Sequence, residues 1–301
     1  MTGPRQARPD ASSRATLDKA TDENFPVAPF FLPRAWRADL MAIYGYARLV
    51  DDIGDGDLAP GGADARHLGA DGETDRVALL DAFEADLRRV FDGTPAHPLL
   101  RALRPTVRRH GLTPEPFIGL IAANRQDQLV RRYETYDDLL AYCELSANPV
   151  GRLVLAVTGT ATPERNRLSD AVCTALQIVE HLQDVTEDLA RDRIYLPADD
   201  MKRFHVTEDD LARPSAGAAV RALVAYEAER ARRLLNEGTP LVGSVHGRLR
   251  LLLAGFVAGG HAALDAIAAA GHDVLPGPPR PTKPTLLREV ATVLRRARRE
   301  G

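Results

Sequence analysis

Apolar residues recur three or four positions apart along almost the whole chain, which is the spacing of one face of an α-helix. No segment alternates apolar and polar residues in the way that predicts a half-buried strand. Clusters of glycine, proline, aspartate and threonine separate the periodic segments and predict turns. The pattern therefore predicts an all-α, single-domain helical bundle with short connections. The predicted helices cover residues 34–53, 75–91, 97–110, 114–131, 136–158, 164–190, 214–236, 247–270 and 284–299.

The composition is that of a globular protein and argues against a nucleic-acid partner. Of the 301 residues, 45% are hydrophobic and 27% are charged, and the formal net charge is −3. A chain so close to neutral lacks the excess of basic residues that a nucleic-acid partner requires. The two cysteines, Cys143 and Cys173, lie within apolar helical segments, so we expect reduced, buried thiols in a cytoplasmic protein.

The two ends of the chain differ from its body. Residues 1–20 are polar and contain no apolar run of the kind that a secretory signal needs, so we expect a disordered leader. Residues 21–275 hold most of the predicted helices and form the expected main domain. Residues 276–301 combine a proline-rich linker with a helix that carries several arginines. That helix can contact an anionic membrane surface, or it can dock on the body by its apolar face, and the sequence leaves both alternatives open.

No segment reaches the roughly 20 continuous apolar residues of a transmembrane helix. The most apolar stretch, LLLAGFVAGGHAALDAIAAAG, is interrupted by His261 and Asp265. We therefore expect a cytoplasmic protein that at most associates peripherally with a membrane.

Two of the predicted helices carry the same arrangement of polar residues on an otherwise apolar surface. In the first helix, four polar residues lie at positions i, i+4, i+7 and i+11, which is one face of a helix. The second helix repeats this spacing, with Glu180 close to the same stripe. The two sets are Tyr44, Arg48, Asp51 and Asp55, and Gln177, His181, Asp184 and Asp188.

Each stripe ends in a pair of aspartates one helical turn apart, and such a pair can share a hard cation. Magnesium bound to a diphosphate takes only one or two protein carboxylates and keeps waters and phosphate oxygens as its other ligands. Taken alone, Asp51, Asp52 and Asp55 can equally be a solvated helix end. Asp184 and Asp188 can likewise belong to an exposed, ion-paired helix. The two stripes together favour ligand binding, because burying them without a ligand is costly.

At these residues the chain resembles the squalene and phytoene synthase family, whose members are trans-isoprenoid synthases. Both aspartate motifs of the family are present, D-x-x-x-D from Asp51 and Q-x-x-x-x-x-x-D-x-x-x-D from Gln177. The run RIYLP, with Arg193 and Tyr195, matches the segment that follows the second motif and helps to cover the diphosphate. Tyr44 and Arg48 match the positions ahead of the first motif.

The resemblance covers about residues 20–270, and further segments narrow it to one branch. The segments 23–33 and 124–155 resemble the C-type enzymes of bacterial squalene and hopanoid pathways, which are similar to hydroxysqualene synthase. The resemblance implies a trans-isoprenoid synthase bundle with a central apolar cavity. It also implies that the protein acts alongside other squalene-pathway enzymes.

The reaction that the resemblance implies is the ionisation of presqualene diphosphate, followed by rearrangement and capture by water to give hydroxysqualene and diphosphate. About two or three Mg²⁺ ions are expected as cofactors, and NADPH is not. One alternative is a condensing synthase that joins two prenyl diphosphates, such as farnesyl diphosphate, into presqualene diphosphate, squalene or phytoene. Another is a catalytically silent relative that serves as a helical assembly or interaction protein.

The resemblance also implies roles for individual residues. The four stripe aspartates and Tyr44 are the expected catalytic residues, and the same aspartates with Glu180 are the expected magnesium ligands. Glu180 stands where the family often has asparagine, so it can bind metal or pair with an arginine. Gln183 and Ala258 stand where family members often have arginine. The expected substrate-binding residues are Asn24, Phe25, Arg48, Asp127, Asn148, Gln177, Arg193 and Tyr195.

Three residues of this region have two interpretations each. Asn148 and the proline after it interrupt a helix. In one interpretation the interruption leaves a backbone carbonyl without its partner, and this carbonyl can stabilise a carbocation. In the other it is only a packing kink, at which Gly151 allows close contact between helices. Asp127 can orient an arginine or a water, or it can form a surface ion pair with Arg131. His181 can contact the diphosphate or handle water, or it can be structural.

Overall fold

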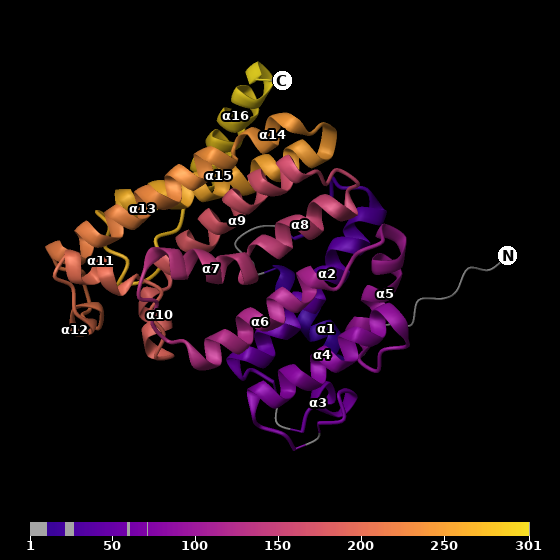
Figure 1. The fold of residues 1–301 in the computed structure, drawn as a ribbon. Coiled ribbons are helices and arrows are strands. Elements are labelled where there is room, and N and C mark those ends of the chain that lie inside the picture. The colour runs from indigo at the N-terminus through magenta and orange to yellow at the C-terminus, as the bar shows by residue number, and fades with distance from the viewer. Residues whose placement is uncertain (1–10, 22–26, 59–60, 71, 301) are drawn as a thin grey trace. The chain divides into compact units, whose positions relative to one another are not determined.

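The computed structural model describes residues 11–21, 27–58, 61–70 and 72–300 (Figure 1). All regular structure in these residues is helical, apart from one isolated parallel bridge between Arg132 and Ile194, so the all-α prediction is confirmed. The helices are α1 (Ala11–Asp18), the 3-10 turn η1 (Lys19–Thr21), α2 (Arg34–Asp55), α3 (Ala63–His67), α4 (Arg76–Asp92), α5 (Pro98–His110), α6 (Glu115–Leu129), α7 (Tyr136–Ser146), α8 (Asn148–Val157), α9 (Pro163–Gln183), α10 (Val185–Ala190), α11 (Ala198–Arg203), α12 (Glu208–Leu211), α13 (Ala218–Gly238), α14 (Pro240–Ser244), α15 (Gly247–Ala269) and α16 (Lys283–Glu300).

The predicted helical segments are present, but two of them are divided. The segment 136–158 is divided at Ala147 into α7 and α8. The proline after Asn148 has no N–H to contribute to a continuous helix, which explains the break. The segment 164–190 is divided at Asp184 into α9 and α10. The short helices α3, α11, α12 and α14 lie in the predicted turns.

The described residues pack into two compact units. The first holds the residues up to Leu129 together with 153–159, and the second holds 130–152 and the residues from Thr160 onward. Each unit contains its own set of fully buried apolar side chains. The expected main domain at 21–275 and its central cavity stay predictions.

Helix α2 is the centre of the first unit and packs against α1, α4, α5 and α6. Tyr46 of α2 is completely buried between Phe83, on which it stacks at 5.5 Å, and Phe117, which it meets edge to face at 5.2 Å. Its hydroxyl donates to the Phe117 carbonyl at 2.8 Å, so the buried polar atom is satisfied. This packing fixes the rotation of α2 and therefore decides which of its polar side chains face outward.

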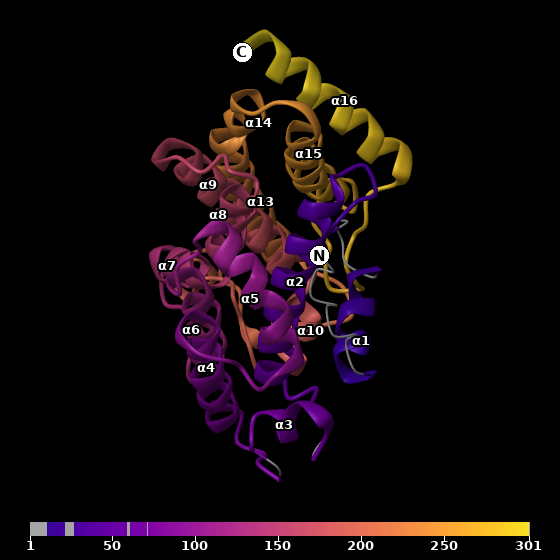
Figure 2. The same ribbon diagram turned by 90° about the vertical axis from the view of Figure 1, so that its right-hand side faces the viewer.

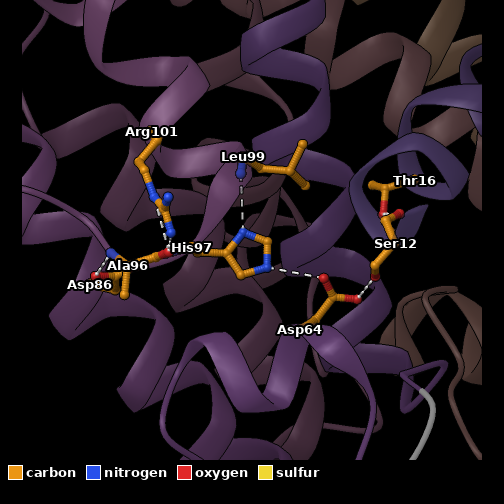
Figure 3. A network of polar contacts seen from close by, with 8 residues as sticks. All are labelled: Ser12, Thr16, Asp64, Asp86, Ala96, His97, Leu99 and Arg101. Atoms are coloured by element: carbon orange, nitrogen blue, oxygen red, sulfur yellow. Dashed lines mark hydrogen bonds and ion pairs between the residues drawn. The ribbon is translucent and has the colours of Figure 1, made fainter. Parts of the chain in front are cut away.

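Helix α1 is anchored to the first unit by a chain of polar contacts (Figure 3). His97 is fully buried, and its Nδ1 accepts from a backbone N–H at the start of α5 at 3.2 Å, so the ring proton is on Nε2. Nε2 donates to Asp64 at 3.1 Å, and Ser12 of α1 donates to the other oxygen of that carboxylate. Residues 11–18 thus form a docked helix where a disordered leader was predicted, because their polar side chains find partners in the unit. Residues 1–10 of that leader lie outside the described residues.

The second unit is built on α9, α13 and α15, which pack against one another. Helix α15 is long and apolar enough to cross a membrane by length and composition, but 61% of its most apolar window is buried inside the protein. Helix α16 lies against α14 and α15 (Figure 2), with Val293 and Ala297 buried. The basic C-terminal helix therefore docks by its apolar face, which was one of the two alternatives, and its contact with a membrane stays a prediction.

Candidate active site

The first aspartate pair lies at the C-terminal end of α2. Asp51 is exposed and accepts a hydrogen bond from the side chain of Asn124 on α6 at 3.0 Å. The helices approach this closely because residue 54 is glycine: a Cβ on Gly54 would lie 1.9 Å from the Asn124 Oδ1. Asp55 is partly buried and is the last residue of α2, which Gly56 ends in the left-handed conformation with φ of 77°. The two carboxylates thus stand one turn apart at the helix end.

Asp52, between the two predicted ligands, is the buried carboxylate of this motif. Lys19 contacts both of its oxygens, at 2.8 and 2.9 Å, and Nε of Arg48 lies 3.0 Å from one of them. The Asp52 side chain is only 6% exposed, so these two cations offset part of the cost of removing its charge from water. Arg48, which was expected to bind the diphosphate, is therefore held against Asp52, with its positive charge beside the motif.

The second pair lies where α9 ends and α10 begins. Asp184 has φ −105° and ψ 14°, so it interrupts the helix that the sequence predicted to be continuous. The N–H of Asp184 still bonds the Glu180 carbonyl at 3.0 Å, and the N–H of Asp188 bonds the Asp184 carbonyl at 2.8 Å. Side chains on either side of the interruption bond to the segment between α15 and α16. The one-turn spacing of the pair therefore survives the break.

His181 connects the second motif to an aromatic cluster. The amide nitrogen of Gln177 lies 3.1 Å from His181 Nε2, and because an amide nitrogen only donates, Nε2 accepts and the ring proton is on Nδ1. Nδ1 faces Asp188 Oδ2 at 3.6 Å. The ring stacks on Tyr195, with centroids 3.6 Å apart and 11° between the planes. The second stripe thus brings Gln177, His181 and Asp188 together, as its spacing predicts.

The pKa of Asp184 is raised above its ordinary value. Partial burial is the largest cause, and the negative charges of Asp188 and Glu187 raise the pKa further. The electrostatic interactions with His181 and Arg280 lower the pKa. The ionised carboxylate is therefore less stable in the protein than in water, and a divalent cation beside it would offset the penalty. The second motif has the electrostatics of a cation site.

Asp188 offers an oxygen that suits a metal. Its Oδ2 is buried and accepts no hydrogen bond from the residues that the structure describes; His181 Nδ1 faces it at 3.6 Å, beyond hydrogen-bond distance. Buried polar atoms nearly always have such a partner, so this oxygen is an available ligand. Within the same residues, no three His, Cys, Asp or Glu side chains converge into a metal site of their own. One or two carboxylates per motif fit Mg²⁺, which takes its remaining ligands from water and phosphate.

The RIYLP segment is held against the second motif. The N–H of Arg193 bonds the Asp188 carbonyl at 2.8 Å. Tyr195 is buried and stacks on Tyr133 at 5.6 Å as well as on His181. The backbone of Arg193 therefore lies beside the motif, and Tyr195 contacts the motif through the imidazole ring of His181.

Asn148 has a structural contact in this region. It is buried, and its Oδ1 accepts from the Thr174 hydroxyl at 2.9 Å, which ties α8 to α9. A Cβ on Gly151 of the same helix would lie 2.3 Å from Ser169 Oγ and 2.6 Å from Cys173 Sγ. The close helix contact that was one explanation of this break is therefore present.

The remaining predicted site residues have varied surroundings. Asp127 is buried on α6, and both interpretations of its role stay predictions. Glu180 is exposed, and Tyr44 is partly buried. Asn24 and Phe25 lie outside the described residues.

Three residues that contact or influence the motifs were not predicted: Lys19, Asn124 and Arg280. Lys19 and Arg280 lie in segments without a periodic pattern, and each reaches its motif through the tertiary structure. Asn124 opens the segment 124–155 that carried part of the family resemblance, and this is the signal that could have identified it.

Comparison with known proteins identifies the family. The squalene/phytoene synthase family model matches residues 18–288. The chain is 36% identical over 233 residues to hydroxysqualene synthase of Zymomonas mobilis subsp. mobilis, covering 75% of this chain and 72% of the relative. It is 32% identical over 241 residues to phytoene synthase of Arthrospira platensis, covering 76% and 74%. The crystal structure of squalene synthase HpnC from Alicyclobacillus acidocaldarius matches with a TM-score of 0.76 and 43% identity, over 87% of this chain and 93% of that one. The chain therefore belongs to the squalene/phytoene synthase family and is an enzyme of the isoprenoid synthase class.

Proposed function

We propose that the enzyme ionises presqualene diphosphate with the help of Mg²⁺ and captures the rearranged cation with water, giving hydroxysqualene and diphosphate. The observation that carries this proposal is the second motif, where Asp184 has a raised pKa and a buried oxygen of Asp188 accepts no hydrogen bond from the described residues and faces His181 at 3.6 Å. The names of similar proteins support the substrate class, since a hydroxysqualene synthase and a squalene synthase are among them.

In this proposal the two aspartate pairs are the protein ligands of the magnesium ions that the diphosphate requires. Asp51 and Asp55 act from α2, and Asp184 and Asp188 act from the junction of α9 and α10. Bound magnesium neutralises charge on the departing diphosphate. Arg193 donates to the diphosphate oxygens, because a guanidinium matches the geometry of phosphate.

The proposed reaction balances without a reductant. The bond between carbon and the diphosphate oxygen breaks, and the diphosphate keeps the bonding electrons. The cation rearranges, a water oxygen forms a new bond to carbon, and one proton is released. NADPH therefore has no role in this proposal. A cytoplasmic location with peripheral membrane contact, and action alongside other squalene-pathway enzymes, belong to the same proposal.

A second candidate is the head-to-head condensation of two prenyl diphosphates, which the 32% identity to a phytoene synthase favours. Farnesyl diphosphate given alone separates the two. A condensing enzyme consumes it and releases diphosphate, whereas the proposed enzyme leaves it unchanged.

The decisive experiment is mass analysis of the products formed from presqualene diphosphate and Mg²⁺, with and without NADPH. Equal formation of hydroxysqualene in both arms supports the proposal. Formation of squalene only with NADPH would contradict capture by water. Consumption of farnesyl diphosphate in a parallel arm would favour the condensing synthase.

The aspartates are tested by Asp51→Asn and Asp184→Asn. A lost magnesium ligand removes several kcal/mol of transition-state stabilisation, so turnover should fall by about a hundredfold or more, with unchanged helical content by circular dichroism. Asp209→Asn, at an exposed aspartate on α12, is the matched control and should keep full turnover. Retained turnover in both ligand variants would remove these aspartates from the mechanism.

The alternative of a catalytically silent assembly protein makes a different prediction. Titration calorimetry with inorganic pyrophosphate would then detect no magnesium-dependent binding. The presence of all four stripe aspartates argues for the enzyme.

A further inference from the structure

The segment between α15 and α16 lies along the second aspartate motif. We call residues 274–282 the strap. Gln183 donates to the Pro279 carbonyl at 2.6 Å, and Thr186 donates to the Leu275 carbonyl at 3.0 Å. These two donors flank Asp184 in the sequence, so the strap runs over the junction of α9 and α10, towards α10 in Figure 1.

The strap is held at both ends as well as in its middle. Just before it, Asp273 pairs with Arg221 at 2.6 Å, and the first two residues of the strap, Val274 and Leu275, are buried. After it, α16 is docked on α14 and α15. A segment with this many anchors keeps a defined course, because little conformational freedom is left to it.

Arg280 is the basic residue that the strap carries to the motif. It follows Pro279, whose carbonyl is bound by Gln183, and it precedes Pro281. Proline fixes its own φ and restricts the residue before it to an extended conformation, so the Arg280 backbone is ordered in advance. Its side chain is exposed and forms no hydrogen bond or ion pair with the described residues, although its charge reaches the Asp184 carboxylate.

We propose that the strap holds Arg280 beside Asp184 as a binding residue for the diphosphate group. This inference rests on the proposed function. The planar guanidinium can donate two parallel hydrogen bonds to phosphate oxygens. Its charge is not neutralised by an ion pair with another described residue. The charge remains in place while negative charge develops on the departing diphosphate, so Arg280 stabilises the leaving group. Gln183 then acts as a positioning residue, because it holds the carbonyl next to Arg280.

The test is titration calorimetry with Mg²⁺ and inorganic pyrophosphate on the full chain. Arg280→Ala should weaken pyrophosphate binding about tenfold, which corresponds to about 1.4 kcal/mol and lies at the low end for a hydrogen bond to a charged group, as suits an exposed side chain. Arg280→Lys should recover part of the affinity. Arg298→Ala, at an exposed arginine of α16 with no hydrogen bond or ion pair in the described structure, is the matched control and should bind like the wild type.

Gln183→Ala tests the positioning of the strap. Hydrogen exchange at the Arg280 and Thr282 amides should become faster, and pyrophosphate affinity should fall several-fold with an unchanged thermal midpoint. Faster exchange without any loss of affinity would overturn the role of the strap, and wild-type affinity in Arg280→Ala would overturn the role of the arginine. Absence of magnesium-dependent binding by the wild type is a distinct result, which would overturn the proposed function itself.

Discussion

Glu227 on α13 provides a test of how a buried acid affects the stability of the second unit. Its side chain is almost completely buried, and Nη1 of Arg230 lies 3.2 Å from its Oε1 and 2.6 Å from Oδ2 of Asp200. Burial is the largest cause that raises the pKa of Glu227, to about 7; the charge of Arg230 lowers it, and Asp200 raises it. We predict that Glu227→Gln stabilises the protein at alkaline pH.

The sign and size follow from proton linkage. The ordinary pKa of a glutamate is 4.5, and that of folded Glu227 is about 7. Between these values the folded protein holds a proton that the unfolded chain has lost, so the free energy of unfolding decreases as the pH rises. The stability contribution is fully present below pH 4.5 and is lost once the pH passes about 7. A difference of about 2.5 pH units, at about 1.4 kcal/mol each, gives an upper estimate of about 3.5 kcal/mol.

Urea unfolding, followed by circular dichroism at pH 5 and pH 8, measures the effect. At pH 8 the Glu227→Gln variant should be more stable than the wild type by up to about 3.5 kcal/mol, and at pH 5 the difference should shrink to about 1 kcal/mol or less. Glutamine keeps an acceptor for Arg230 and a donor for Asp200. Glu229→Gln, at an exposed position of the same helix, should change neither value.

The opposite outcome has a clear physical meaning. If ionised Glu227 stabilised the fold as the partner of Arg230, removing its charge would cost about 3–5 kcal/mol, as breaking a buried ion pair does. A variant less stable than the wild type at pH 8 would therefore refute the reasoning.

Two further predictions concern packing around the motifs. Gly54→Ala brings a methyl group to 1.9 Å from the Asn124 Oδ1, so the Asn124 side chain must move away from Asp51. We expect the free energy of unfolding in urea to fall by about 1–3 kcal/mol and the binding of magnesium pyrophosphate to weaken. Wild-type values for both would contradict this prediction. Asn148→Ala leaves the buried Thr174 hydroxyl without its acceptor, which should cost about 1–3 kcal/mol, so an unchanged free energy of unfolding would count against the contact.

Much of the fold and of the second motif followed from local spacing. The stripe of Gln177, His181 and Asp188 was predicted because residues three, four or seven positions apart share a face of any helix. The structure brings these side chains together at 3.1 and 3.6 Å. The interruption at Asp184 was not predicted, because helical periodicity continues through it and the contacts of Gln183 and Thr186 come from a segment about 90 residues away.

The first motif shows the limit of such reasoning more clearly. The sequence identified Asp51, Asp52 and Asp55 as one acidic cluster but did not distinguish among them. The packing of Tyr46 sets the rotation of α2, and with it Asp52 becomes the buried partner of Lys19 while Asp51 stays exposed. Lys19 was assigned to a disordered leader, since a short polar segment carries no signal for the surface on which it docks.

By itself, the sequence determined the helical class, the two aspartate motifs and the family to which they belong, because all three depend on spacing within single helices. Only the tertiary structure decided which carboxylates are buried, that Arg280 is carried to the second motif and that α16 docks on α15. These features arise from contacts between residues far apart in the chain. Their free energies depend on burial and charge at positions that local spacing does not encode.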